Sequence, residues 1–363
     1  MMWPMRPGPA LVRRCVLVAS TALVVPLASG CGLLDGLLGG SPLEEALEYA
    51  PAGSTVVEFV DRTAIVERLG VDDVDADSGE QDLVRYVTAY DDAAAGTRLL
   101  SWVSVMRSEA SFSDLDVEWE TTTEFADTSA WAWKLSDDVD LDEVAADLED
   151  AGYEQSDTSA DDVAVLAAPD GTRASNGLNG GRYPRFLDRI ALVPDEHLVV
   201  AGDGLAEVLD VVLDDAESLV DDGGFQELLE VIDPDDDVEL AQLERDDAVC
   251  RVARVARPRG PAAALLEDLG TPADAALVVA DDGPPTAVLR FADEDAAEAD
   301  ASAREAYLAA VGRRSAFGPA YDVAAHGSTV RVQAQVDDTG AGTLPRFVRA
   351  ESAGGGSLAC SPE

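Results

Sequence analysis

The chain has 363 residues, and its 72 acidic residues against 25 lysines and arginines give a formal net charge of −47. An apolar content of 47% excludes general disorder, and so acidic a surface repels phosphates, which excludes sequence-independent binding of nucleic acid. The soluble partners that fit this charge are cationic molecules, cationic proteins or uncharged ligands. The alternative is that the charge serves solubility alone.

The first 30 residues have the pattern of a secretory signal peptide. Arg6, Arg13 and Arg14 form a basic start, and an uncharged, mostly aliphatic run follows from Cys15 to Ser29. At a rise of about 1.5 Å per residue, a helix of this run is too short to cross a hydrocarbon core of about 30 Å. We therefore expect residues 1–30 to be a cleaved leader.

The leader ends on Cys31, directly after Ala28, Ser29 and Gly30. This end resembles the lipobox of bacterial lipoproteins, although the commonest form has a large aliphatic residue at the position of Ala28. The resemblance implies that Cys31 becomes the mature N-terminus and carries a diacylglyceryl group. Two acyl chains anchor a protein stably, which predicts a lipid-anchored protein on the extracytoplasmic face of the cell membrane. The alternative is an ordinary signal peptide, with Cys31 an incidental thiol.

Composition and glycine content indicate the organisation that follows. A single lysine beside 24 arginines is typical of a high-GC genome, and the overall organisation resembles lipoproteins of actinobacteria. Residues 31–42, with four glycines, predict a flexible tether. The remainder predicts an α+β fold of two related units, 43–233 and 234–363, each a mainly antiparallel sheet covered by helices. The boundary falls in "DPDDD", residues 233–237.

The first unit reads as alternating strands and helices. Asp61 predicts the N-cap of a helix that Gly70 ends, and Asp140 with Glu143 predicts a capping box for a helix that Gly152 ends. Branched and aromatic residues predict strands in 54–60, 97–107, 128–135, 161–168, 189–193 and 197–201, the last two forming a hairpin.

Helical spacing is clearest at the end of this unit. Leu205, Val208, Leu209 and Val212 follow the spacing of a buried helical stripe, and a second such stripe covers 225–232. The second unit predicts a helix near 261–269, a strand–turn–strand over 275–292, an alanine-rich helix over 293–311 and a hairpin over 321–336.

The cysteines beyond Cys31 predict a disulfide. Outside the cytosol, a pair such as Cys250 and Cys360 is first interpreted as a bridge. It would close a loop of about 110 residues, worth about 4–5 kcal/mol in the chain-entropy model. Neither cysteine has a histidine nearby in the sequence, which disfavours zinc.

No catalytic motif stands out. Only two histidines exist, His197 and His326, each at a predicted turn, and the chain lacks a Gly-x-Ser-x-Gly elbow and a phosphate-binding loop. We therefore expect no enzyme. Hydrolysis by two carboxylates stays open, because 72 acids allow many pairings and mark none.

Three patterns are candidates for binding. "DVDADSGE" places Asp73, Asp75 and Asp77 at alternate positions, as in the first half of a calcium loop, although the later positions depart from that pattern. Calcium is the one cofactor that the sequence suggests, and a solvated charged loop is the alternative. Trp131 and Trp133 share a strand face and would stack on a ligand if exposed or belong to the core if buried. The arginines at 251, 254, 257 and 259 form an anion patch or offset nearby acids.

These observations predict a non-enzymatic, lipid-anchored envelope protein with a binding or accessory role. Its partners would be the membrane, through the lipid, and a cationic molecule or protein of the envelope. The first alternative is a solute-binding lipoprotein of a transporter, with a ligand cleft lined by the tryptophans or the arginines. The second is an envelope hydrolase with paired carboxylates. The small-molecule ligand is not readable from the sequence.

Overall fold

The leader, Cys31, the predicted boundary at 233–237 and the arginines at 251–259 lie outside the described residues. No helix among the residues described is long and apolar enough to cross a membrane. The structure, a computed structural model, describes residues 41–93, 97–156, 163–168, 183–232, 238–245, 248–250, 261–280, 284–311, 321–335 and 360.

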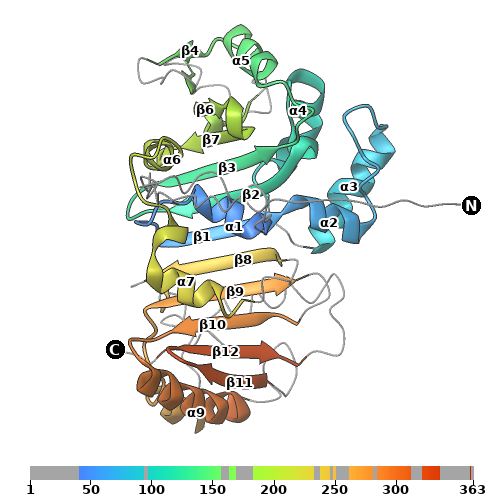
Figure 1. Ribbon diagram of the computed structural model, residues 1–363. Helices are drawn as coiled ribbons and strands as arrows, with labels where there is room; N and C mark the ends of the chain where they lie inside the picture. Colours follow the sequence, from blue (N-terminus) through green and yellow to red (C-terminus); the bar gives the residue numbers. More distant parts are fainter. Residues whose placement is uncertain are drawn as a thin grey trace, which may run out of the picture. The chain divides into compact units, whose positions relative to one another are not determined.

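A single antiparallel sheet forms the centre of the fold (Figure 1). The strands are β1 (Val56–Asp61), β2 (Val117–Glu124), β3 (Ser129–Leu135), β4 (Glu154–Gln155), β5 (Ala164–Ala167), β6 (Arg189–Val193), β7 (Leu198–Gly202), β8 (Val238–Arg245), β9 (Asp274–Ala280), β10 (Thr286–Arg290), β11 (Tyr321–His326) and β12 (Thr329–Ala334). Their order across the sheet is β11-β12-β10-β9-β8-β1-β2-β3-β7-β6-β5-β4. The predicted α+β class with mainly antiparallel strands is thus confirmed.

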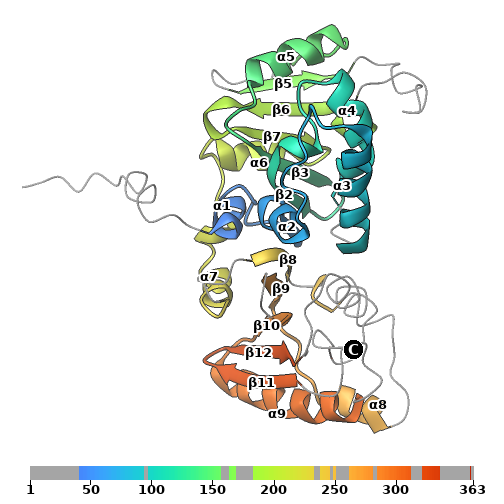
Figure 2. The ribbon, with the colours of Figure 1, turned by 90° about the vertical axis from the view of Figure 1, so that its right-hand side faces the viewer.

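Helices cover both faces of this sheet (Figure 2). On one face lie α1 (Pro42–Glu48), α6 (Leu205–Val212) and α7 (Gly223–Leu229), which share an apolar core with every second residue of the central strands. On the other face lie α2 (Arg62–Leu69), α3 (Glu80–Ala93), α4 (Val103–Glu109), α5 (Leu141–Asp150), α8 (Pro261–Leu266) and α9 (Glu294–Val311). Burial on both faces explains why β6, β7, β9 and β10 are apolar at nearly every position.

The strands of the two predicted units join side by side. Strand β8 pairs with β1 from Val56↔Glu244 to Val60↔Leu240, and its other edge pairs with β9. The apolar core under α1, α6 and α7 runs across this β1–β8 seam without a break, since it includes residues of β1, β8 and β9. The sheet therefore continues from one half of the chain into the other.

Charged side chains hold the ends of the strands at this seam. The Arg245 guanidinium bonds to Asp222 at the N-cap of α7 (2.7 Å) and to Asp274 at the start of β9 (3.1 Å). Arg290 of β10 bonds to the same Asp274, with Nε 2.7 Å from the carboxylate. The Arg290 guanidinium lies so close to Gly224 that a Cβ there would stand 2.8 Å from Cζ, so a larger residue at this position would have to displace the Arg290 side chain. The start of α7 is thereby fixed to three strands.

Most predicted elements form as the sequence indicates. The Asp61 carboxylate accepts a hydrogen bond from the Ala64 amide and Gly70 ends α2 with a φ of +62°. Asp140 caps α5 in the same way, whereas the reciprocal bond from Glu143 that a capping box needs is not formed. The hairpins β6–β7 and β11–β12 are confirmed.

The strand predicted over 97–107 is wrong. This segment forms a short 3₁₀ turn and then α4. Leu99, Val103 and Met106 are spaced as on one helical face, and all three are buried against β3 and α5. The branched residues that suggested a strand are here packed by their helical spacing. Ser41 and Pro42, predicted to end the tether, instead form the N-cap and first residue of α1.

A buried ion pair fastens α2 to the segment that leads into β2. Arg62 and Asp114 are each 1% exposed, and Nη1 of Arg62 lies 2.9 Å from the carboxylate of Asp114. Tyr86 donates a hydrogen bond to the same carboxylate (2.9 Å), and the Tyr90 ring lies 4.5 Å from the guanidinium carbon. Every charge in the pair therefore has a partner, as burial requires.

We expect Asp114→Asn to lower the free energy of unfolding by about 3–5 kcal/mol, because it leaves the buried Arg62 guanidinium without its counter-charge. Asp73→Asn is the matched control, since Asp73 pairs with Arg85 at an exposed site and its loss should cost less than about 1 kcal/mol. Urea denaturation of both variants measures the difference. Equal effects of the two substitutions would contradict this assignment.

Candidate functional site

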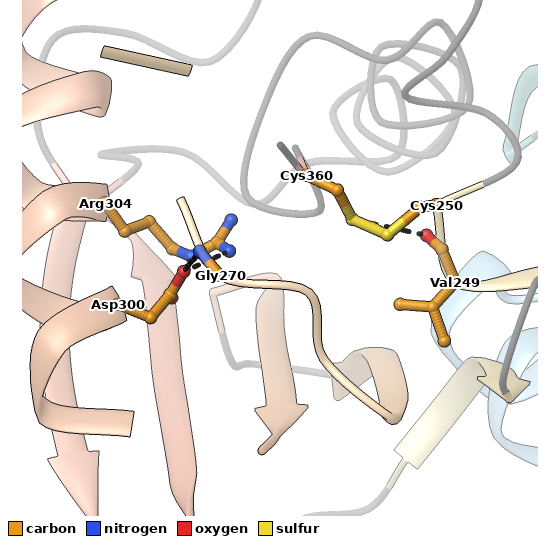
Figure 3. The surroundings of a disulfide bond; sticks show 6 residues. All are labelled: Val249, Cys250, Gly270, Asp300, Arg304 and Cys360. Carbon is orange, nitrogen blue, oxygen red and sulfur yellow. Dashed lines mark hydrogen bonds and ion pairs between the residues drawn. A yellow bond between two sulfur atoms is a disulfide. The ribbon is translucent and has the colours of Figure 1, made fainter. Parts of the chain in front are cut away.

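The predicted disulfide is present. Cys250 and Cys360 are bridged, with Cα atoms 5.7 Å apart, and both are buried (Figure 3). They lie in the apolar core that α8 and α9 share with β9, β10 and β12. In the same region Asp300 of α9 pairs with Arg304 (2.7 Å) and accepts a hydrogen bond from the Gly270 amide (2.8 Å). The bridge therefore joins Cys360 to a packed core.

Cys250→Ala and Cys360→Ala should each lower the free energy of unfolding by about 4 kcal/mol, since either one opens a loop of 110 residues. The double variant should lose no more than a single one apart from small packing effects. Chemical denaturation with and without a thiol reductant measures this, and the reductant should destabilise only the unsubstituted protein. If the reductant left the unfolding free energy of the unsubstituted protein unchanged, this result would contradict the disulfide.

The three aspartates of the predicted calcium loop are not gathered around an ion position. Asp73 pairs with Arg85 (2.7 Å), and Asp75 accepts hydrogen bonds from the Asp77 amide and the Ser78 hydroxyl. These bonds lower the pKa of Asp75. Across the described ranges, no group of three or more His, Cys, Asp or Glu side chains could hold a metal ion. The geometry corresponds to the charged-loop alternative.

The two tryptophans share one face of β3, as the alternation predicts. Trp133 is fully buried and its Nε1 donates to Glu120 (2.7 Å). Trp131 is half-buried, its ring lies under the Arg98 guanidinium (4.8 Å to the centroid), and both indoles contact the ring of Phe186. Trp133 is therefore core, and the stacking surface of Trp131 is already occupied by Arg98.

Glu120 is an ionisable group that the sequence analysis missed. It lies on β2 opposite Trp133 and is 3% exposed, and its carboxylate also accepts from the Arg98 amide (3.1 Å). Burial raises the pKa of Glu120 to about 7, although Arg62 and the two donors favour the charged form. Strand β2 also contains Glu118 and Glu124, and acids in a strand usually face solvent, so the sequence gave no signal that Glu120 is enclosed.

Glu120→Gln should change how stability depends on pH. Because the folded state holds the Glu120 proton up to about pH 7, whereas an ordinary glutamate releases it near 4.5, stability falls as the pH rises through this window. The unfolding free energy of the unsubstituted protein minus that of the Glu120→Gln variant should therefore drop by about 3 kcal/mol between pH 5 and pH 8. Denaturation at both pH values measures it, with Glu143→Gln on the exposed side of α5 as control. A constant difference would contradict the enclosed carboxyl.

The two histidines lie at distant places in the fold. His197 ends the turn between β6 and β7, and His326 ends β11. In the sheet order β11 is first and β7 ninth, so strand spacing of about 4.8 Å separates them by on the order of 40 Å. They do not form a joint site.

A groove of about 550 Å³ lies between α7 and the β11–β12 hairpin. We call it the α7 groove. It brings together two carboxylates, an imidazole, a guanidinium and hydroxyl groups from segments about a hundred residues apart. Its lining is Glu227, Glu230, Val231, His326, Gly327, Ser328, Thr329 and Arg331.

The hairpin turn gives the α7 groove a fixed wall. Gly327 has a φ of +56° at the first central position of a two-residue turn, a conformation that favours glycine. The Thr329 hydroxyl donates to the His326 carbonyl (2.8 Å), and the Ser328 hydroxyl donates to the Glu227 carboxylate (2.7 Å). The second bond ties the turn to α7, so the two walls of the groove are connected.

Comparisons with known proteins give a likeness of fold only. No family model and no curated protein matches the sequence. Among solved structures, crystal form I of TP0453 is 9% identical with a TM-score of 0.41, over 87% of this chain and 99% of that chain. Crystal form III is 9% identical with a TM-score of 0.37, over 85% of this chain and 97% of that one. At these values the likeness assigns no function.

Proposed function

We propose that this protein is a lipid-anchored component of the extracytoplasmic face of a bacterial cell membrane, with a non-enzymatic binding or accessory role. The observation that carries the proposal is the short apolar run that ends on Cys31 after three small residues. A disulfide within the core fits an oxidising compartment, in which such bridges persist. The strongly acidic surface repels anionic headgroups, so a covalent lipid is the physically suitable attachment.

The buried ionisable groups support a role other than catalysis. Perturbed groups in an enzyme lie in a cleft where a substrate reaches them. Here Asp114 is enclosed by Arg62 and Tyr86, and Glu120 is enclosed by Trp133 and the Arg98 backbone. These contacts hold the fold together, and the raised pKa of Glu120 arises from its burial.

A binding role within this class is favoured by the α7 groove. The alternative of a solute-binding lipoprotein, as predicted from the sequence, requires a ligand cleft lined by the tryptophans or by the arginine cluster. No tryptophan is among the described residues that line the α7 groove, whose polar groups come from α7 and the hairpin, and the arginine cluster lies outside the described residues. Trp133, which was a ligand candidate, is buried in the core.

Cys31→Ala tests the anchor. In a bacterium that processes lipoproteins, the unsubstituted chain should yield a mature protein that begins at Cys31, carries diacylglyceryl mass and partitions into the detergent phase of Triton X-114. The variant should stay unprocessed or enter the aqueous phase. Cys15→Ala, within the leader, is the matched control and should behave as the unsubstituted chain. Mass spectrometry showing another first residue, or Cys31 without acyl mass, would overturn the anchor.

A further inference from the structure

We propose that the α7 groove binds a small zwitterion of the amino-acid or dipeptide class, with its carboxylate on Arg331 and its ammonium group on Glu230. This inference rests on the binding role proposed above and names its ligand class. The argument depends on which charges of the lining are already satisfied within the protein and which are available.

Arg331 is the positive group of the groove. It lies on β12, where its neighbours Val330 and Val332 pack into the core with α9, so Arg331 is on the α7 face of the sheet. Its Nε is buried without a hydrogen-bond partner among the described residues, and it forms no ion pair there with Glu227 or Glu230. A guanidinium binds a carboxylate through two parallel hydrogen bonds, which makes a carboxylate a suitable partner.

Glu230 is the available negative group. Of the two carboxylates in the lining, Glu227 accepts the Ser328 hydroxyl, whereas Glu230 has no side-chain partner among the described residues. Glu230 is exposed at the C-cap of α7. A primary ammonium group satisfies such a carboxylate with a charge-assisted hydrogen bond. The groove thus offers one available charge of each sign.

This combination selects among ligand classes. Two carboxylates beside one guanidinium repel a phosphate dianion, and the guanidinium repels a divalent cation. A solute with one charge of each sign satisfies both Arg331 and Glu230. The volume of about 550 Å³ lies within the range of about 300–1,000 Å³ for small-molecule sites and exceeds the needs of a single amino acid, so a dipeptide also fits.

The experiment is a calorimetric titration of the full-length protein in non-ionic detergent with three probes. L-alanyl-L-alanine carries both charges, N-acetyl-L-alanyl-L-alanine lacks the ammonium group, and L-alanyl-L-alanine amide lacks the carboxylate. We expect saturable binding of L-alanyl-L-alanine at one site and at least tenfold weaker binding of each capped form. Absence of saturable binding, or equal binding of all three probes, would overturn the proposal.

Two variants assign the charges. Arg331→Gln should weaken binding of L-alanyl-L-alanine at least tenfold and remove its advantage over the amide. Glu230→Gln should weaken binding of L-alanyl-L-alanine by a similar factor and make it bind no more tightly than N-acetyl-L-alanyl-L-alanine. Arg189→Gln on β6 and Glu207→Gln on α6 change the same charges at exposed positions far along the sheet, and both should bind as the unsubstituted protein. Loss of binding in these controls, or unchanged binding in both groove variants, would contradict the site.

The groove and the anchor are separable. The Cys31→Ala protein should bind L-alanyl-L-alanine as tightly as the unsubstituted protein, because residue 31 lies outside the folded unit that contains the groove. A failed titration with normal lipidation removes only the ligand assignment. A missing lipid with normal titration removes only the anchor. A circular dichroism spectrum and melting temperature equal to those of the unsubstituted protein show that each variant is folded.

Discussion

Backbone pairing between β1 and β8 makes one sheet of strands that come from the two halves of the chain. The apolar core under α1, α6 and α7 spans this seam, and Arg245, at the end of β8, bonds to Asp222 and Asp274. These bonds fix the start of α7 against the sheet. The other end of α7 forms a wall of the α7 groove, so the position of the groove depends on the pairing at the seam.

Local signals in the sequence were sufficient for most elements of this fold. A helix bounded by Asp61 and Gly70 needs only a capping oxygen and a residue that tolerates positive φ, and both are visible in the sequence. The segment around Val103 was misassigned, because branched residues favour strands locally while their spacing places them on a buried helical face. Local patterns could not predict the order of the strands, because β8 pairs with β1, which lies nearly two hundred residues earlier in the chain.

The candidate site was less predictable than the fold. Cys250 and Cys360 could be paired because the sequence has only four cysteines and the other two lie in or directly after the predicted leader. Glu230 and Arg331 come from a helix end and a strand about a hundred residues apart, and no motif links them. In a chain with 72 acids, a single glutamate carries no information about its surroundings. Only the tertiary structure shows which charges lack a partner.

The burial of the ion pairs Arg62–Asp114 and Asp300–Arg304 affects how this protein responds to high salt concentrations. Both pairs are almost completely shielded from solvent, so dissolved ions cannot reach between their members. The repulsion among surface carboxylates acts through water, where a Debye length of about 8 Å at physiological ionic strength shrinks to about 3 Å at 1 M. Rising salinity therefore weakens the repulsion among the surface carboxylates and leaves these two enclosed pairs unscreened, so the two kinds of charge respond differently to dissolved electrolyte.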